Sequence, residues 1–191
     1  MRLVVCLAGL SVVIGGLTGV RLRHGVTVRT EENDIMPQNV ALYRQDDERW
    51  AKERLGDSSY TMKSSGCLVS CIASAVSMEG GQAVTPGELN TLFSEHDVYD
   101  REGNLQWKAL EKAGGYSVNV YQNVSEAEID SCLTAGHYPI VRVRMNGIGN
   151  YHYVLIVGIE DSDYICMDPL KDELTGLSRY LNRVYAMRLV M

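Results

Sequence analysis

The sequence lacks any cluster of basic side chains. Lys and Arg number 18 against 24 Asp and Glu, and the formal net charge is −6. Residues 1–24 hold three arginines and no acid, so the rest of the chain has 15 basic and 24 acidic residues, a charge of about −9. Nucleic-acid binding requires clustered Lys and Arg to neutralise phosphates. We therefore expect no nucleic-acid partner.

Metal-binding spacings, repeats and low-complexity tracts are also missing. The five cysteines and four histidines do not fall into the pattern of a structural zinc site. Two acidic pairs, Asp46-Asp47 and Asp161/Asp163, are typical of turns, with calcium binding as a second interpretation. We expect no metal and no cofactor.

The first 24 residues contain an uncharged, mostly apolar segment at 3–20. As a helix it would span about 27 Å, just enough for a hydrocarbon core. A signal anchor or a signal peptide is expected, although the cleavage site is poor and the preceding charged region short. A buried core helix or a misplaced start is the alternative. The flanking arginines do not fix the orientation. We expect a membrane-associated protein whose body lies outside the cytoplasm, where Cys132 and Cys166 could pair.

The chain divides into this segment, a polar linker at 25–40 and one folded domain at 41–191. Helices are expected first, and an antiparallel sheet after them. This order predicts an α+β fold with N-terminal helices packed on a C-terminal sheet. The expected helices are a short one ending at 55–56, one that has Cys67 in its first turn and is stopped by Gly80-Gly81, and those near 86–93, 104–113 and 125–134. The expected strands are 118–120, 139–144, 151–159, 164–167 and 184–190.

Cys67 opens the helix around which the rest of the domain is arranged. Apolar residues recur with helical spacing at Leu68, Cys71, Ile72, Ala75 and Val76. Ser64 and Ser65 are suitable N-caps, and Gly66 permits a sharp turn. The positive end of a helix stabilises a thiolate, so Cys67 is a candidate nucleophile. The alternative is a small buried hydrophobic residue, which is our interpretation of Cys71.

A histidine and an aspartate accompany two consecutive strands. His152 begins the most hydrophobic strand, and Asp168 follows the next one. A carboxylate at imidazole Nδ1–H would fix the tautomer and stabilise the imidazolium that a cysteine nucleophile needs. In an ideal hairpin, however, Asp168 would lie opposite residue 155 or 156, about 10–13 Å from His152 at ~3.3 Å per residue. Their contact therefore requires a β-bulge or a strong twist.

Together these motifs resemble the papain-like clan, specifically the free-standing bacterial C39-like cysteine peptidases. The resemblance rests on Gly66-Cys67 at a helix start, His152 within Tyr-His-Tyr-Val-Leu-Ile-Val-Gly, and Asp168-Pro169. Gln45 to Trp50 is similar to the Gln-x-Asp-x-Arg-Trp segment of many bacterial members. The resemblance covers about residues 43–190 and implies a papain-like cysteine peptidase fold.

The resemblance also implies roles for four side chains. Cys67 would form a thioester with the substrate and His152 would act as general base and acid. Asp168 would orient His152, and Gln45 would help the Cys67 N–H to bind the oxyanion. The implied partner is a peptide or protein substrate.

The chain departs from the family pattern at two points. Leu68 follows the nucleophile where many relatives have a small residue, and nothing resembles the ABC transporter fused to bacteriocin-processing members. Their double-glycine leader substrate is therefore not implied. Two alternatives stay open. One is a cell-wall peptide amidase or transferase of the same clan, which more often has a second histidine in place of Asp168. The other is a catalytically silent binding module.

Overall fold

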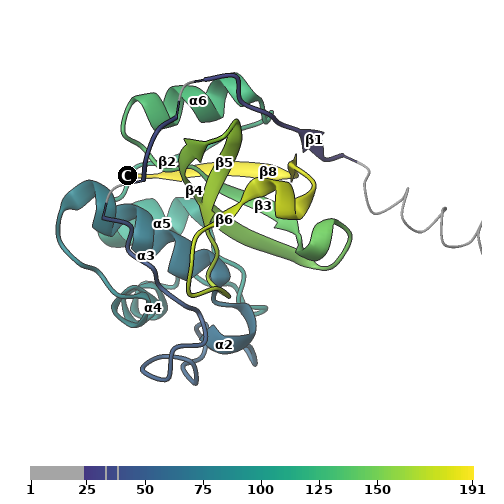
Figure 1. Ribbon diagram of the computed structural model, residues 1–191. Coiled ribbons are helices and arrows are strands. Elements are labelled where there is room, and N and C mark those ends of the chain that lie inside the picture. Colours follow the sequence, from purple (N-terminus) through teal and green to yellow (C-terminus); the bar gives the residue numbers. More distant parts are fainter. Residues whose placement is uncertain (1–23, 33, 38) are drawn as a thin grey trace, which may run out of the picture.

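A six-stranded antiparallel sheet forms the centre of the computed structural model, which describes residues 24–32, 34–37 and 39–191 (Figure 1). The strand order is β2-β8-β3-β4-β5-β6. A separate two-stranded pair joins β1 to β7. The strands are β1 (Val26–Thr27), β2 (Val118–Val120), β3 (Ile140–Arg144), β4 (Tyr151–Glu160), β5 (Asp163–Met167), β6 (Thr175–Gly176), β7 (Arg183–Val184) and β8 (Ala186–Val190).

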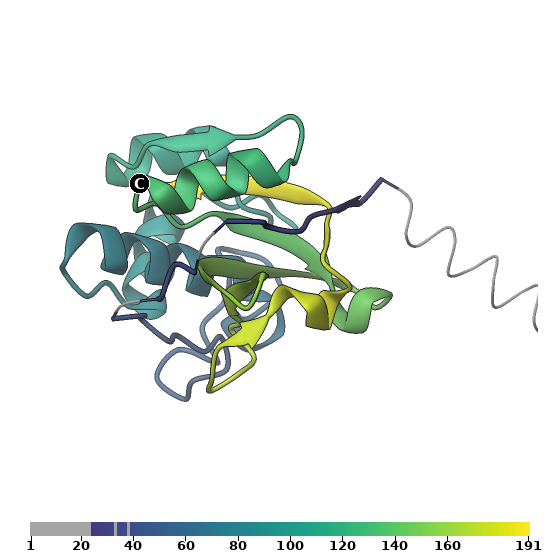
Figure 2. The same ribbon diagram turned by 45° about the horizontal axis from the view of Figure 1, so that its top comes forward.

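Helices cover both faces of this sheet. The N-terminal group packs on one face and α6 lies across the other, beside the N-terminal segment (Figures 1 and 2). The α+β class is confirmed, but α6 occupies the face opposite the other helices. The helices are α2 (Met62–Ser65), α3 (Cys67–Gly80), α4 (Pro86–Glu95), α5 (Trp107–Gly114) and α6 (Glu126–Thr134), with 3-10 turns η1 (Met145–Gly147) and η2 (Leu177–Tyr180).

Strand β4 is buried on both faces, and its residues alternate between two hydrophobic cores. Leu155 and Val157 belong to the core beneath α3, α4 and α5. Val154 and Ile156 belong to the core beneath α6. Successive side chains of a strand point to opposite faces, so an apolar run on a central strand serves both layers. The position of β4 between β3 and β5 confirms the predicted central strand.

Two helix starts follow the sequence closely. The Thr85 hydroxyl accepts from Glu88 N–H while the Glu88 carboxylate accepts from Thr85 N–H, with Pro86 at the first helical position. Ser125 accepts from Glu128 N–H at the start of α6. Such caps satisfy N–H groups that have no partner inside the helix.

The start of α3 differs from the prediction. Its N-cap is Gly66, which offers no side chain, instead of Ser64 or Ser65. Ser64 instead closes a capping box with Thr61 at the preceding short helix α2. Ser64 is therefore used one turn earlier than expected, and α3 begins with a cap that leaves its first N–H groups without a side-chain acceptor.

The predicted linker at 25–40 is wrong for much of its length. Val26 and Thr27 pair with β7, and Ile35 exchanges two hydrogen bonds with Ile159, both 2.9 Å. Val28 is only 1% exposed. A few apolar residues spaced among polar ones anchor the segment along the sheet, so the folded body begins well before residue 41.

Residues 47–53 also differ from expectation, because they form turns instead of a short helix. The Trp50 and Ala51 N–H groups both donate to Asp47 O, at 3.1 and 2.8 Å. The Asp47 side chain accepts from Arg49 N–H and from the Arg49 guanidinium. These local bonds compete with helical ones.

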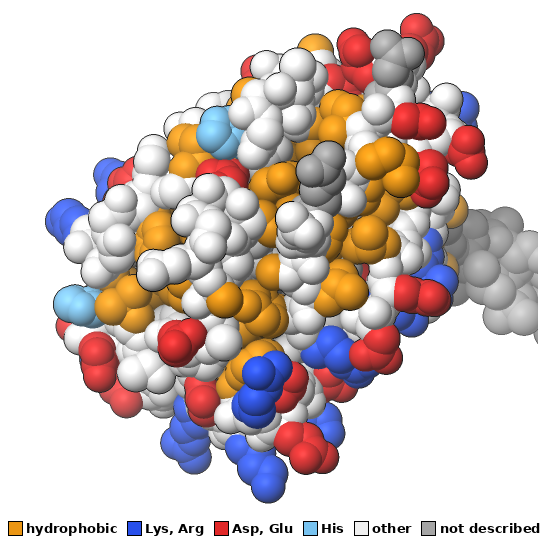
Figure 3. Space-filling model, turned by 60° about the vertical axis from the view of Figure 1, so that its left-hand side comes forward, with side chains coloured by type: hydrophobic (Ala, Val, Ile, Leu, Met, Phe, Trp, Pro, Cys, Tyr) orange, Lys and Arg blue, Asp and Glu red, His pale blue; other side chains and the backbone are white. Residues whose placement is uncertain are grey.

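The predicted membrane segment at 3–20 lies outside the described residues. Within the ranges that are described, no helix combines the length and apolar character of a membrane span. Cys132 and Cys166 are buried free thiols, so the disulfide considered above is not formed. On the face shown in Figure 3, Lys and Arg side chains are interspersed with acidic ones near the rim and hydrophobic side chains occupy the middle.

Candidate active site

Cys67 is the first residue of α3 and lies half-buried at the wall of a cleft of about 460 Å³. The cleft is bounded by Tyr153 of β4 and by the loop at 102–105. Gly66 is required here, because a Cβ atom at that position would lie 2.5 Å from Met62 O. The close contact lets α3 start directly after α2 with its first residue facing the cleft. One turn later, Cys71 is fully buried, as predicted.

His152 and Asp168 form a buried pair. His152 Nε2 lies 2.6 Å from Asp168 Oδ1, and the two residues are 4% and 1% exposed. The carboxylate therefore contacts Nε2 and not the predicted Nδ1. Nδ1 is left free to face another group.

A β-bulge makes this contact possible. Ile156 lies opposite Cys166 and Gly158 opposite Ile165, so Val157 is an extra residue on β4. Without the extra residue, Asp168 would lie opposite Leu155 and on the other face from His152. With it, Met167 lies opposite Leu155, and Asp168 continues toward Val154 on the face of His152. A one-residue shift exchanges the faces of a strand.

The N-terminal segment crosses the strand at this bulge. A Cβ atom on Gly158 would lie 2.3 Å from Ile35 O and 2.9 Å from Pro37 Cδ, so only glycine admits the crossing. The paired hydrogen bonds between Ile35 and Ile159 hold the segment in place beside the bulge.

Asp168 receives two further hydrogen bonds. The Tyr180 hydroxyl donates to Oδ2 at 2.5 Å, and Leu170 N–H donates to Oδ1 at 2.9 Å. Burial raises the pKa of Asp168, but hydrogen bonding and charge from His152, with help from Tyr180, outweigh it and lower the pKa below its usual value. Both carboxylate oxygens are thus held. Tyr180 was missed by sequence reasoning, because no motif marks it.

The electrostatics of His152 connect it to both neighbours. Burial lowers the pKa of His152, but hydrogen bonds to Asp168 and Cys67, and the charges of both, raise it to about 9. The imidazolium form is therefore favoured at neutral pH. Because Asp168 occupies Nε2, Nδ1 is the ring nitrogen available to interact with the Cys67 thiol.

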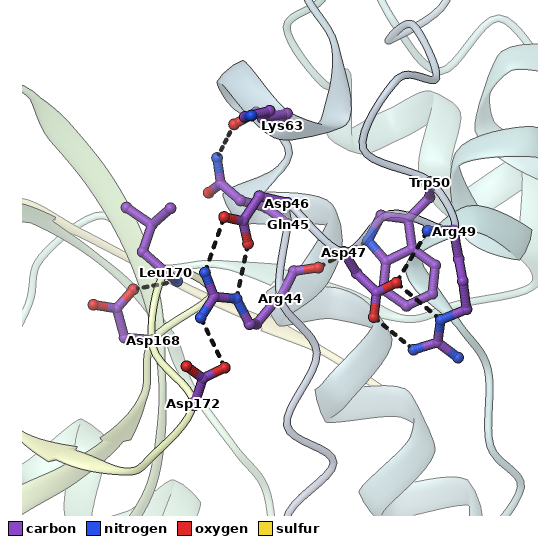
Figure 4. A network of polar contacts seen from close by, with 10 residues as sticks. All are labelled: Arg44, Gln45, Asp46, Asp47, Arg49, Trp50, Lys63, Asp168, Leu170 and Asp172. Carbon is purple, nitrogen blue, oxygen red and sulfur yellow. Dashed lines mark hydrogen bonds and ion pairs between the residues drawn. The ribbon is translucent and has the colours of Figure 1, made fainter.

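Gln45 joins the segment before Cys67 to the segment after Asp168 (Figure 4). Its backbone N–H donates to Pro169 O at 3.0 Å, and its side-chain Nε2 donates to Lys63 O at 2.7 Å. The residue is 4% exposed, and its Oε1 is buried without a partner. Gln45 therefore lies between the two segments that carry the other candidate residues.

The acidic pair Asp46-Asp47 is engaged by arginines. Arg44 contacts Asp46 at 2.8 Å and Arg49 contacts Asp47 at 2.8 Å (Figure 4). Among the described residues, no group of three or more His, Cys, Asp or Glu side chains is arranged to hold a metal ion. In this loop the carboxylates fix the chain through ion pairs and turns.

Comparison with known proteins gives information on the fold. No protein-family model matches the chain, and no curated protein matches it in sequence. Among solved structures, the crystal structure of a "putative C39-like peptidase" from Bacillus anthracis superposes with a TM-score of 0.58 at 13% identity. The match covers 84% of this chain and 98% of that one. At this identity the likeness concerns the fold: the chain has a fold similar to that of a C39-like peptidase.

Proposed function

We propose that this protein is a cysteine peptidase that hydrolyses peptide bonds through a thioester on Cys67. The observation that carries the proposal is the buried His152–Asp168 pair, whose Nε2 and Oδ1 atoms are 2.6 Å apart, together with the influence of Cys67 on the pKa of His152. A thiol at a helix start, an imidazole and a buried carboxylate in that order are the groups needed to activate a cysteine. The half-buried position of Cys67 at a cleft allows a substrate to approach.

The reaction follows from these positions. The Cys67 thiolate attacks the carbonyl carbon, and the imidazolium of His152 gives its proton to the leaving amine as the C–N bond breaks. His152 then takes a proton from water, which attacks the thioester and releases the acid. Asp168 accepts from Nε2–H throughout, which fixes the ring and stabilises its charged form.

Two donors are available for the oxyanion. The Cys67 N–H lies in the first turn of α3, where backbone N–H groups have no partner inside the helix. One N–H of the Gln45 side-chain amide donates to Lys63 O, and its second N–H is available to another acceptor. We assign both to the developing negative charge, a contribution of several kcal/mol in related chemistry (about 3–4 per donor).

The expected setting of the enzyme is also a proposal. Residues 3–20 would tether the protein to a membrane, with the peptidase body outside the cytoplasm acting on peptide or protein substrates. The support for the tether is the apolar composition of 3–20.

The test combines hydrolysis with thiol labelling. Cys67→Ala should abolish cleavage in peptide and muropeptide libraries with little change in melting temperature. Cys132→Ala, a matched change at a buried thiol in the other core, should retain cleavage. Burial raises the pKa of the Cys71, Cys132 and Cys166 thiols. Iodoacetamide at neutral pH should therefore modify Cys67 before these three, as mapped by mass spectrometry, and His152→Ala should slow that modification.

Three outcomes separate the alternatives. Equal turnover by the wild type and Cys67→Ala would contradict the proposed function. Cleavage restricted to muropeptides would indicate the amidase alternative. Rapid labelling that does not depend on His152, without any turnover, would indicate a binding module.

A further inference from the structure

Three arginines share the sheet face that carries α3, beside the Cys67 cleft. Arg142 of β3 lies opposite Tyr153, and Arg144 lies opposite Tyr151. Arg188 of β8 lies opposite Ile140, two residues before Arg142, which places it on the same face. Directly opposed side chains project from the same side of an antiparallel pair. The three arginines therefore come from two neighbouring strands, β8 and β3, and β4 lies next to them.

Aromatic rings hold these guanidiniums in place. Arg142 and Arg144 lie 4.4 and 4.0 Å from the centre of the Tyr151 ring, and Arg188 lies 5.4 Å from that of Trp107. Stacked arginines lose little freedom on binding a planar anion, because the guanidinium is already oriented.

These three arginines, unlike Arg44 and Arg49, do not form an ion pair with a carboxylate of the described residues. Within the described residues, Arg44 and Arg49 each contact a carboxylate, whereas none of Arg142, Arg144 and Arg188 has one within 4.0 Å. The Nε atoms of all three are buried and lack a hydrogen-bond partner. Partly buried cations without an anion are costly. Three such arginines lie together in a protein whose net charge is negative, so this cluster could bind an anion from outside the protein.

Tyr153 connects the cluster to the cleft. It forms part of the same wall as Cys67. Burial raises the pKa of Tyr153, while Arg142 and Arg188 lower it and Cys67 raises it. One phenol thus feels the charges of both arginines and of the nucleophile. Glu102 also lines the cleft.

We infer that Arg142 and Arg188, arranged around Tyr153, form a subsite for a carboxylate of the substrate. Resting on the proposed function, this inference identifies the substrate class as peptides with a carboxylate close to the scissile bond. The carboxylate could belong to an acidic side chain or to the free C-terminus of a short peptide. Glu102, which also lines the cleft, should repel a second carboxylate, so we expect the preference at a single substrate position.

The first experiment measures cleavage. Fluorogenic peptide pools carry either Glu or Gln at one fixed position, and each pool is made with a free or an amidated C-terminus. We expect the wild type to favour one carboxylate-bearing pool by about tenfold or more in kcat/KM, the size of one charge-assisted hydrogen bond. The pool identifies whether the side chain or the terminus is recognised. R142Q and R188Q should each reduce the preference.

The control is R29Q, which removes the same charge from an exposed position between the N-terminal segment and α6. It should leave the preference unchanged. An equal loss in R29Q would indicate a general charge effect and overturn the subsite. So would wild-type kcat/KM values that are equal for Glu and Gln at every position and for both termini.

The second experiment separates this inference from the proposed function. The same peptides, with a fluorescent label, are titrated against the Cys67→Ala protein and followed by anisotropy. Tighter binding of the carboxylate form, lost in the Cys67→Ala/Arg142→Gln protein and weakened by salt, supports the subsite even if no peptide is hydrolysed. Equal binding of carboxylate and amide forms overturns it, while hydrolysis dependent on Cys67 would leave the proposed function standing.

Discussion

The two sides of the candidate site are positioned by different means. On the helix side, Cys67 is placed by local features: a glycine, a short preceding helix and the start of α3. On the sheet side, His152 and Asp168 meet because one extra residue in β4 changes the register of a hairpin. The helix side depends on a close backbone contact, and the sheet side on buried hydrogen bonds. We therefore expect substitutions on the two sides to differ in their effects on activity and on the free energy of unfolding.

The largest effect is expected from removing the carboxylate on the sheet side. Asp168→Ala should lower kcat/KM by a factor on the order of 10² to 10⁴, because the imidazole loses its orientation and its counter-charge. It should also lower the free energy of unfolding by about 3 kcal/mol, because a buried pair is broken. Asp168→Asn should fall between Ala and the wild type, since an amide oxygen still accepts from Nε2–H without carrying charge.

Peptide hydrolysis and urea unfolding of the three proteins measure these effects. Asp168→Ala activity within twofold of the wild type would show that the pair is structural alone and would remove Asp168 from the proposed mechanism.

A smaller effect is expected from crowding the helix side. Gly66→Ala places a methyl group 2.5 Å from Met62 O, a backbone atom that cannot move alone. We expect a loss of roughly 1–3 kcal/mol in the free energy of unfolding, together with reduced turnover as Cys67 shifts. Gly80→Ala near the end of the same helix meets no atom within 4 Å and is the matched control. It should be neutral or slightly stabilising, by up to about 1 kcal/mol. Equal melting temperatures for the two variants would contradict the argument.

The smallest effect concerns pH. The pKa of His152 rises from 6.5 to about 9 in the folded state, so the folded state binds this proton more tightly than the unfolded chain. The resulting stabilisation is complete below about pH 6.5 and is lost as pH rises through about 9. Activity should fall over the same alkaline range, because imidazolium is the proton donor.

Stability and rate measured from pH 6 to 10 test this prediction. Asp168→Asn should move the alkaline fall in activity toward lower pH, because Asp168 is one of the groups that raise the pKa of His152. An alkaline limb that does not move in this variant would contradict the assignment of the limb to His152.

The helix side and much of the fold could be predicted from sequence, because local signals specify them. The spacing of Leu68, Ile72 and Val76 predicted α3, and Thr85 followed by Pro86 is a local sequence signal for the start of α4. Capping and periodicity act over three or four residues, so they are visible in a short window. The order of helices and strands was sufficient for the α+β class.

The sheet side could be predicted only in part, because β4 is apolar on both faces. A one-residue shift in the register of such a strand would move Val154 to the face of Leu155 and the reverse. Both residues are apolar, so either register buries apolar side chains on both faces. The hydrophobic pattern therefore does not reveal the bulge at Val157. Tyr180 lies on a 3-10 turn whose contact with Asp168 depends on that register. The alternation of apolar and charged residues in β3 is the same whether Arg142 is exposed to solvent or partly buried. These features depend on tertiary packing.

The crossing at Gly158 has a consequence for where the working protein begins. Ile35 and Pro37 contact β4 at the point where its register changes. Both belong to the polar segment 25–40, which was predicted to be a linker. A variant that begins at residue 41 would keep all four proposed catalytic side chains but would lose the contacts of Ile35 and Pro37 beside the bulge. The folded body therefore begins upstream of the motifs that identify the candidate site, and we expect its N-terminal segment to support the register of β4 on which the contact between His152 and Asp168 depends.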